Sequence, residues 1–384
     1  MMAHICMLLR DDIRLDGRVR KEIRTLSQAG HEVELVVSDY TKTGTGGDDL
    51  GIKIHYVPLN LWSLPAINFA EDLRFNRRIA SIVQRIRPTH IHCHDLNTLM
   101  AGVWAKDKLS ATLTFDAHEL MPESMGGIKE SIWGLIERRC IPKCDHIIMP
   151  EKHRIAYFLK KYPNVPQPFL LENFPKRSDI PVTHDDIFRK KYPIGHDQMI
   201  ILYSGIVHPK RQIEELVNSM TICDEKFVLV VLGNPYKNYA DVLQGKIKEL
   251  GIEDRVFIHQ QVPHTEILQY MASCDIGAAF YPNTNLNNYY CASNKIYEYI
   301  ALEKKILTNN YPGLLEVVGR GGHGVCLENV TAQSLADAYA GLAKTDLSPT
   351  SKRYYWEAQE DTLLQIYELS VKDERRASVK TFEL

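Results

Sequence analysis

Short apolar runs alternate along the whole chain with longer stretches in which apolar residues recur at helical spacing. Buried parallel strands are nearly continuous apolar segments, and crossover helices connect them. The pattern therefore predicts an α/β protein built from parallel sheets. The first series of expected strands comprises residues 4–9, 32–37, 53–57, 90–93, 112–115, 146–149 and 169–171. The second comprises residues 199–203, 227–232, 255–259, 275–280, 305–308 and 324–327.

The periodicity breaks between the two series, where Pro, Gly and polar residues occupy 173–178, 181 and 193–197. We place a domain boundary there and expect two Rossmann-like halves, which a length of 384 residues accommodates. Open parallel sheets bind ligands at the carboxyl ends of their strands, so a cleft between the two halves is the expected site.

Composition narrows the classes of partner. With 46 basic and 48 acidic residues the net charge is -2, too balanced for a protein whose main partner is nucleic acid. No run of about 18 apolar residues is present, and the apolar segment 5–9 is too short for a signal peptide. The eight cysteines are scattered, as buried thiols are in a reducing compartment, and we expect a cytoplasmic protein. Cys140, Cys144 and His146 form the one cysteine cluster, and their spacing is poor for zinc.

Two expected loops follow apolar strands and carry a glycine beside cations. Gly17 permits close backbone approach at the start of a helix, whose positive dipole end favours an anion or a sugar hydroxyl. No G-x-G-x-x-G pattern is present, and a turn with a solvated basic helix face is the alternative interpretation. Gly205, Lys210 and Arg211 follow the strand at 199–203, where the cations would meet a leaving phosphate; a basic turn in solvent is the alternative.

A third loop leads into a helix near residue 294. Ser293 and Asn294 are potential N-cap residues, so free backbone amides and Lys295 would together hold a diphosphate. Glu298 lies in the first turn of this helix, where an acid also favours the helix dipole and can pair with Lys295.

Titratable residues cluster after two strands of the first half. Asp116, His118 and Glu119 come directly after the strand at 112–115, where α/β proteins commonly carry functional groups. Alternate positions of a strand share one face, and three histidines alternate here: His90, His92 and His94. With no carboxylate partner at a fixed spacing, we favour packing and hydrogen bonding over metal ligation for these histidines.

Taken together, these segments resemble glycosyltransferase family 4, which has the GT-B fold and transfers sugars from nucleotide donors with retention. The resemblance covers most of the chain and depends on the order of its segments. They are 16–19, 29–33, 115–119, 262–264, 293–299, 310–316 and 355–360. It implies two Rossmann-like domains with mainly parallel sheets that face across a cleft. The expected domains are 1–173 on the acceptor side and 174–355 on the donor side, with residues 356–384 as a helix that packs back on the first domain and a tail.

The resemblance also implies roles for individual residues. His118 lies beside the donor sugar and the reacting centre, Arg211 takes the family's phosphate-binding Lys position, and Glu298 matches the glutamate placed on the ribose hydroxyls. The expected catalytic set is His118, Arg211 and Lys295. The expected donor site adds Gly17, Gly205, Ser293, Asn294 and Glu298, and the expected acceptor site is Asp16, Arg18 and Glu119.

Two positions depart from the family pattern. The family usually has two glutamates separated by seven residues, and Tyr290 occupies the position of the first one. Ile206 occupies a position where Arg is common. These departures leave open a non-catalytic sugar-nucleotide binder, and the shared architecture leaves open a nucleotide-sugar 2-epimerase.

The expected activity is a retaining, metal-independent hexosyltransferase that needs no cofactor. It moves a sugar from a nucleotide-diphosphate donor to a glycan or lipid-linked acceptor in bacterial surface polysaccharide synthesis. We expect no partner nucleic acid and a peripheral contact with the anionic inner face of the plasma membrane. Two groups of residues suggest this membrane contact: the basic Arg14, Arg18, Arg20, Lys21 and Arg24, and the apolar Trp62, Leu64, Ile67 and Phe69. A solvated helix face with interleaved acids is the equally supported alternative.

Overall fold

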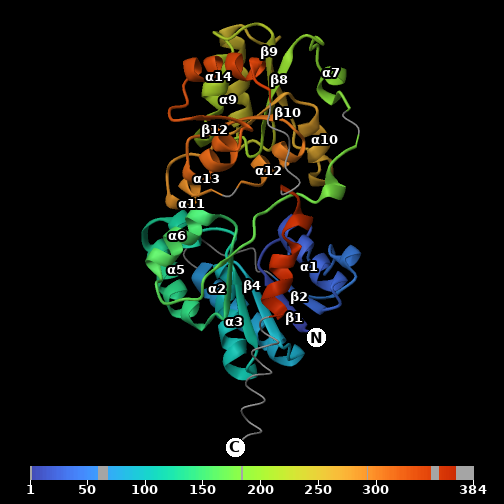
Figure 1. The fold of residues 1–384 in the computed structure, drawn as a ribbon, viewed down its shortest axis with the longest axis vertical. Helices are drawn as coiled ribbons and strands as arrows, with labels where there is room; N and C mark the ends of the chain where they lie inside the picture. Colours follow the sequence, from blue (N-terminus) through green and yellow to red (C-terminus); the bar gives the residue numbers. More distant parts are fainter. Residues whose placement is uncertain (1, 59–67, 183–184, 292, 347–353, 369–384) are drawn as a thin grey trace, which may run out of the picture. The chain divides into compact units, whose positions relative to one another are not determined.

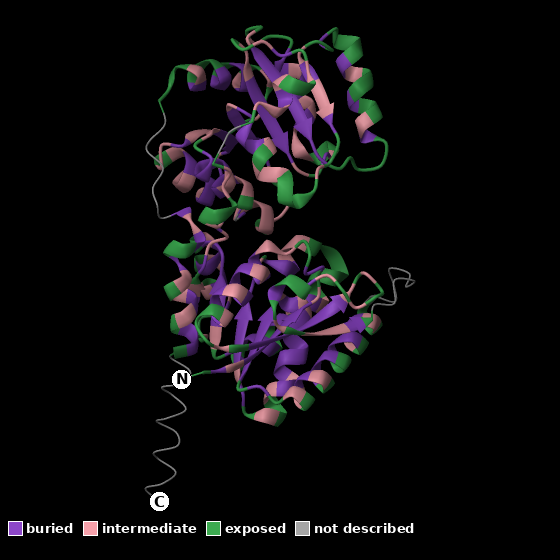
Figure 2. Ribbon diagram, turned by 90° about the vertical axis from the view of Figure 1, so that its right-hand side faces the viewer, coloured by how far each residue is buried: buried purple, intermediate pink, exposed green. Residues whose placement is uncertain are grey.

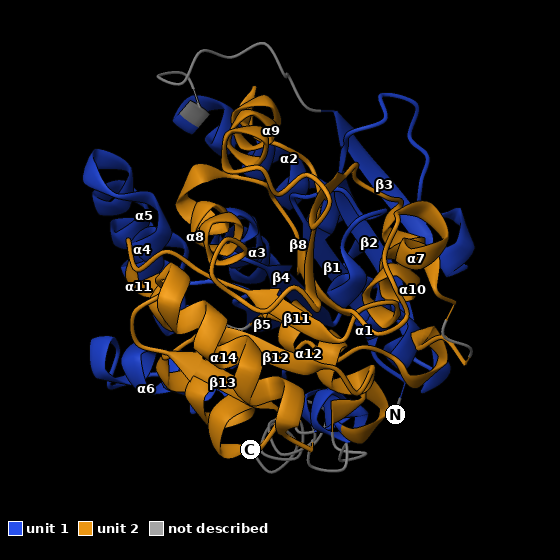
Figure 3. Ribbon diagram, turned by 90° about the horizontal axis from the view of Figure 1, so that it is seen from above, with its two compact units in different colours: residues 1–172, 359–384 blue, residues 173–358 orange. Residues whose placement is uncertain are grey.

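The computed structural model describes residues 2–58, 68–182, 185–291, 293–346 and 354–368 (Figure 1). It divides into two compact units (Figure 3). Unit 1 contains residues 1–172 and 359–384, and unit 2 contains residues 173–358. The expected domains ended at residues 173 and 355.

Unit 1 is built on a seven-stranded sheet in the order β3-β2-β1-β4-β5-β6-β7, in which every pairing is parallel. Its strands are β1 (His4–Leu9), β2 (Glu32–Asp39), β3 (Lys53–Pro58), β4 (His90–His94), β5 (Thr112–Asp116), β6 (His146–Met149) and β7 (Phe169–Leu170). Its helices are α1 (Gly17–Gln28), α2 (Asn68–Ile86), α3 (Leu96–Leu109), α4 (Met121–Met125), α5 (Gly127–Cys140) and α6 (Lys152–Lys161).

Unit 2 is built on a six-stranded sheet in the order β10-β9-β8-β11-β12-β13, again with parallel pairings. Its strands are β8 (Met199–Ser204), β9 (Phe227–Leu232), β10 (Val256–His259), β11 (Ile276–Ala279), β12 (Lys305–Asn309) and β13 (Gly324–Leu327). Its helices are α7 (Ile187–Lys191), α8 (Ile213–Ser219), α9 (Tyr239–Leu250), α10 (Ile267–Ala272), α11 (Leu286–Tyr289), α12 (Asn294–Ala301), α13 (Pro312–Leu314) and α14 (Ala332–Lys344).

The strands of both sheets are largely buried, with helices on their faces (Figure 2). In unit 1, α2, α3 and α5 pack in series on one face. A right-handed crossover places α1 on the opposite face, because β1 to β2 runs the other way across the sheet from β3 to β4. The fold class is therefore as expected: each unit is a Rossmann-like α/β sheet, and every expected strand is present.

The C-terminal segment returns to unit 1 beside α1 (Figure 1). A 3-10 turn at Trp356–Ala358 still belongs to unit 2, where the fully buried Trp356 donates its backbone N–H to the carbonyl of Pro175. Helical residues 360–368 follow, and the hydroxyl of Thr25 in α1 donates to Glu360 at 2.8 Å. The returning helix thus begins at residue 360, after the buried Trp356.

Among the helices of the described ranges, none combines the length and apolar character that crossing a membrane requires. All eight cysteines are free thiols, and six of them are buried.

Candidate functional site

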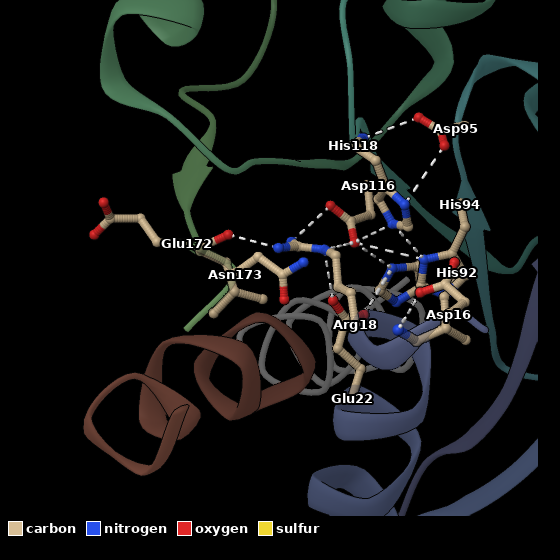
Figure 4. A network of polar contacts seen from close by, with 12 residues as sticks. Asp16, Arg18, Glu22, His92, His94, Asp95, Asp116, His118, Glu172 and Asn173 are labelled. Atoms are coloured by element: carbon tan, nitrogen blue, oxygen red, sulfur yellow. Dashed lines mark hydrogen bonds and ion pairs between the residues drawn. The ribbon is translucent and has the colours of Figure 1, made fainter. Parts of the chain in front are cut away.

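A network of charged side chains lies at the carboxyl edge of β4 and β5 in unit 1 (Figure 4). β5 ends at Asp116, and His118 follows two residues later. β4 ends at His94, and Asp95 precedes α3. Since parallel strands end at the same edge, β4 and β5 bring these side chains together.

Arg18 from α1 is the buried cation of this network. Its side chain is 3% exposed and forms two hydrogen bonds with the carboxylate of Asp116, at 2.8 and 2.9 Å, and one with the carbonyl of Leu171 at 2.7 Å. Its Nε is also 3.1 Å from Glu22 Oε1. The sequence predicts that Arg18 contacts an acceptor from a basic helix face; in the structure its guanidinium points into the unit, against the carboxylate of Asp116 and the side chain of Glu22.

The network controls the charge of Asp116. Burial alone would raise the pKa of its carboxyl, but the charges of Arg18 and His118 hold this pKa well below its usual value. Asp116 is therefore a fixed anion whose oxygens are occupied by cations. A carboxylate engaged in this way is poorly suited to act as a nucleophile.

The ring of His118 lies between two carboxylates. Its Nε2 is 3.2 Å from Asp116 Oδ2 and 3.1 Å from His94 Nδ1, and its Nδ1 is 3.5 Å from Asp95 Oδ2. Its backbone N–H donates to Asp95 Oδ1 at 3.0 Å, and its carbonyl accepts from Arg154 at 2.7 Å. Burial alone would lower the pKa of His118, but Asp95 and Asp116 raise it to about 10.

Asp95 holds an unusual backbone conformation, with φ 59° and ψ 164°. Few residues other than glycine adopt this region, and such strain costs on the order of 1–3 kcal/mol and concentrates at functional sites. Burial raises the pKa of Asp95 to about 6, although the charge of His118 opposes the rise. The carboxylate therefore remains ionised at neutral pH, next to the His118 ring.

Glu22, His92, His94 and Asp116 have potential ligand atoms within 4.8 Å of one another, a spacing that could hold a metal ion. However, Arg18 already lies against both carboxylates, and its positive charge opposes a second cation. Burial also raises the pKa of Glu22 well above its usual value, which makes its carboxyl a poorer anionic ligand. The donor set therefore fits a protein cation better than a metal.

The alternating histidines face α1 and the returning C-terminal helix. His92 Nδ1 lies 2.5 Å from the hydroxyl of Tyr367, and the ring of His90 is 5.6 Å from the ring of Tyr367. These contacts are the packing and hydrogen bonding that the sequence favoured for the histidines.

The other predicted residues of unit 1 lie near the start of α1 and after β5. Asp16 is the N-cap of α1 and accepts the backbone N–H of Val19 at 3.0 Å. Gly17 is half-buried, and an added Cβ would meet no atom within 4 Å. Glu119 is exposed. The fold itself therefore does not require a glycine at position 17.

The expected basic face around α1 is largely neutralised by acidic neighbours. Arg14 pairs with Asp12, and Arg20 and Arg24 both pair with Asp49. Of the expected apolar segment, Phe69 is 40% exposed, whereas Trp62, Leu64 and Ile67 lie outside the described residues. The face offers less free positive charge to a membrane than its sequence suggested.

In unit 2, the predicted donor residues gather at the carboxyl edge of the central strands. Gly205 follows β8 with φ 148°, and a Cβ there would lie 3.1 Å from Cε of Lys295. Gly233 follows β9 with φ 154°, and its Cβ would lie 1.6 Å from the carbonyl oxygen of Gly205. Two glycines thus let two strand ends and the Lys295 side chain come close together.

Arg211 lies at the same edge. Its guanidinium is 5.0 Å from the centre of the Tyr281 ring and donates a long hydrogen bond of 3.5 Å to the carbonyl of Phe280. The hydroxyl of Tyr281 bonds in turn to Ser293, the residue before α12. Among the described residues, neither Arg211 nor Lys295 forms an ion pair, in contrast to Arg18 in unit 1.

The N-terminus of α12 carries no side-chain cap. Ser293 is buried against Tyr281, and Asn294 accepts a hydrogen bond from Asn173 at 2.8 Å, so neither side chain occupies the helix end. Glu298 is half-buried within this helix, and in the described part of the chain it has no hydrogen-bond or ion-pair partner. The amides of α12 and two unpaired cations therefore converge at one edge.

The two departures from the family pattern lie close to this edge. Ile206 is 59% exposed directly after Gly205. Tyr290 ends α11, and its ring contacts Tyr289 at 5.0 Å.

Sequence reasoning missed Asp95, Glu22 and Tyr281. The residue pair His94-Asp95 at a strand end was a usable signal for Asp95. No local sequence pattern indicates Glu22 or Tyr281. Glu22 joins the network only because α1 packs on the sheet, and Tyr281 joins the unit 2 site only through its contacts with Arg211 and Ser293.

Two family models match the chain. A glycosyl transferase 4-like domain matches residues 17–165, and glycosyl transferases group 1 matches residues 184–361. Together they span most of both units. A comparison with curated protein sequences gives no significant match.

Three solved structures that resemble the chain belong to differently named proteins. HepE from Anabaena, in complex with UDP-glucose, is 15% identical with a TM-score of 0.73, covering 95% of this chain and 100% of that one. The lipopolysaccharide outer core galactosyltransferase WaaB is 12% identical with a TM-score of 0.66, covering 97% and 99%. A Listeria monocytogenes protein described as a UDP-N-acetylglucosamine 2-epimerase is 12% identical with a TM-score of 0.68, covering 97% and 98%. At these identities the likeness establishes the fold.

Proposed function

Because the chain belongs to the GT-B glycosyltransferases, we propose that it is a retaining hexosyltransferase. It takes a sugar from a nucleotide-diphosphate donor and transfers it to a glycan or lipid-linked acceptor. Unit 2 binds the donor, and unit 1 supplies His118 and the acceptor side.

The observation that carries this proposal is the pair of unpaired cations, Arg211 and Lys295, beside the uncapped end of α12. Arg18, the buried cation of unit 1, lies against the carboxylate of Asp116, whereas neither cation at this edge has such a partner among the described residues. Cations without a carboxylate partner, next to a helix N-terminus that has no side-chain cap, form a site for an anion. A diphosphate has the charge and the several acceptor oxygens that such a site can satisfy.

The same groups can assist the reaction. As the sugar–phosphate bond breaks, negative charge grows on the departing diphosphate, and fixed donors lower the barrier most where charge develops. One such contact contributes about 3 kcal/mol in the transition state, roughly a hundredfold in rate.

We propose front-face attack for retention. The acceptor oxygen bonds to the anomeric carbon, the bond from that carbon to the phosphate oxygen breaks, and the acceptor proton passes to the departing phosphate. Asp116 is unsuited to be the nucleophile of a double displacement, because Arg18 and His118 occupy its oxygens. Side chains and helix amides neutralise the diphosphate, so the proposal includes no metal and no cofactor.

Two of the similar proteins support the choice of substrates. HepE is named in complex with UDP-glucose, and WaaB is named as a lipopolysaccharide galactosyltransferase. A surface glycan acceptor agrees with the name of WaaB, and peripheral binding to an anionic membrane belongs to the same proposal.

The test begins with binding. A ligand at a hundred times its dissociation constant adds about 2.7 kcal/mol to the stability of the folded state, which thermal-shift measurements with UDP, GDP and ADP would detect. We expect one nucleotide to stabilise the protein, and the double variant R211A/K295A to lose this stabilisation. K248A, at an exposed lysine of α9, serves as the control. Equal stabilisation of the double variant would contradict the proposed site.

Activity is then measured with the donor alone and with added acceptors. Transfer or slow donor hydrolysis supports a transferase. Conversion of the donor into its 2-epimer without any acceptor would support an epimerase, and nucleotide binding with no turnover would support a non-catalytic binder. Unchanged transfer in EDTA supports metal independence, and activity that EDTA removes and manganese restores would refute it.

A further inference from the structure

The two ring nitrogens of His118 both face carboxylate oxygens, at 3.5 Å from Asp95 and 3.2 Å from Asp116. An ionised carboxylate only accepts hydrogen bonds, so a ring nitrogen beside it interacts favourably when it carries a hydrogen that it can donate. A neutral imidazole has a single N–H, whereas the positively charged ring has two. The geometry therefore favours the charged form of His118.

The two carboxylates are not equivalent. Asp116 divides its charge between Arg18 and His118, and it has to compensate a buried guanidinium whether or not His118 is present. Within the described ranges, Asp95 forms an ion pair with His118 and with no other residue. Each of its oxygens serves His118, one at the backbone N–H and the other at the ring.

The position of Asp95 supports a role beyond folding. A strained backbone between β4 and α3 aims its carboxylate at His118. The Asp95 and His118 side chains remain 23% and 19% exposed, so both lie at the rim of the network rather than within the core. A purely structural acid would not require a conformation that a glycine adopts more easily.

We propose that Asp95 is a positioning residue that fixes the ring of His118 and keeps it positively charged. This inference rests on the proposed function for its catalytic consequence. His118 then supplies unit 1 with a fixed positive charge that the transfer reaction uses, and does not act as a general base, which would have to be neutral.

Other charged or titratable groups surround His118 and remain in place when Asp95 is changed. His94 from β4 and Asp116 from β5 contact its ring, and Arg154 from α6 bonds to its carbonyl. Six further groups act on the network from nearby positions: Asp11, Asp16, Arg18, Glu22, His92 and Glu119.

The experiment compares the wild type with D95N, which keeps the size of the side chain and removes its charge. D107N is the matched control, because Asp107 lies in α3 and pairs on the surface with Lys143. Histidine NMR follows the His118 ring against pH, with its signal assigned by its absence from H118N. We expect the wild-type ring to stay protonated to at least pH 9 and the D95N ring to titrate at least one pH unit lower.

Transfer activity is measured over the same pH range. In the wild type and D107N we expect no loss of kcat between pH 7 and 9. In D95N, kcat should fall at least about twofold across this range, following the titration of His118, because the positive charge is lost as pH rises through the lowered pKa.

The two measurements separate the inference from the function on which it rests. Titration of the wild-type ring near its ordinary pKa, or an unchanged ring titration in D95N, would overturn the role of Asp95 even in a protein with no measurable transfer. A shifted ring titration with an unchanged pH profile of kcat would overturn the catalytic use of the charge. If no variant turns over any donor, the NMR result still decides the role of Asp95, and the failure falls on the proposed function.

Discussion

The guanidinium of Arg18 and the carboxylate of Asp116 form a two-point hydrogen-bonded pair, although 98 residues separate them in the chain. The pair joins the first turn of α1 to the end of β5, at the edge where His118 lies. It therefore ties the position of α1 to the geometry of the candidate site.

Removal of Arg18 should destabilise unit 1 strongly. In R18A, Asp116 and Glu22 remain buried without their cation, and breaking a buried pair in this way typically costs about 3–5 kcal/mol. R24A removes an exposed partner of Asp49 and should cost less than about 1 kcal/mol. Urea denaturation of both variants provides the comparison. A loss for R18A no larger than that for R24A would show that the buried pair is not a main support of the unit.

The backbone strain at Asp95 predicts an unusual order of stabilities. D95A and D95G lose the same side-chain contacts, but only glycine adopts φ 59° and ψ 164° without strain. We expect D95G to be more stable than D95A by about 1–2 kcal/mol, the relief of strain being partly offset by the greater freedom of glycine in the unfolded chain. Equal denaturation midpoints for D95G and D95A would show that backbone strain at position 95 does not affect stability.

Two glycines at the candidate site should respond differently to alanine. At Gly17 a Cβ meets no atom within 4 Å, so G17A should fold with stability within about 0.5 kcal/mol of the wild type. Because we expect this loop to approach the substrate, the transfer activity of G17A should nevertheless fall.

Gly205 has φ 148°, and a Cβ there presses on Lys295. G205A should therefore lose on the order of 1–3 kcal/mol of stability as well as nucleotide binding. Denaturation curves and thermal shifts with nucleotide distinguish the two cases. A loss of stability in G17A comparable to that in G205A would contradict this assignment.

Stability below neutral pH should depend on Glu34 in β2. Burial alone would raise the pKa of its carboxyl, but hydrogen bonds from His55, Lys53 and His4 lower it. Because the folded-state pKa lies below the unfolded one, this stability is fully present above the unfolded value near 4.5 and is lost as pH falls through the lowered folded value.

E34Q tests this dependence. The variant should be less stable by about 1–3 kcal/mol at pH 7, since hydrogen bonds to a charged group are lost. Its free energy of unfolding should change less than that of the wild type between pH 5 and pH 3. Parallel curves for the two proteins across this range would show that Glu34 does not contribute to the acid dependence.

The pattern of apolar and polar residues was sufficient to predict the secondary structure and the fold class. Runs such as 5–9 and 227–232 are apolar throughout, as in a strand that is covered on both faces, and such strands are typical of a parallel sheet. Local signals also marked residues that gather at strand ends, including His118, Arg211 and Lys295, because glycines and polar residues after an apolar run indicate the functional edge of a sheet.

The burial and the ion-pair partners of these residues depend on how the folded chain packs around them. Arg18 and Arg211 both follow a strand near a glycine in the sequence, yet Arg18 is buried between two acids and Arg211 has no ion-pair partner among the described residues. Their partners come from elements far away in the chain, and the charge of a side chain depends on its burial and on what lies within a few ångströms. Local sequence determines which residues stand at the edge of a sheet, whereas packing of distant elements determines which of them remain available to a ligand.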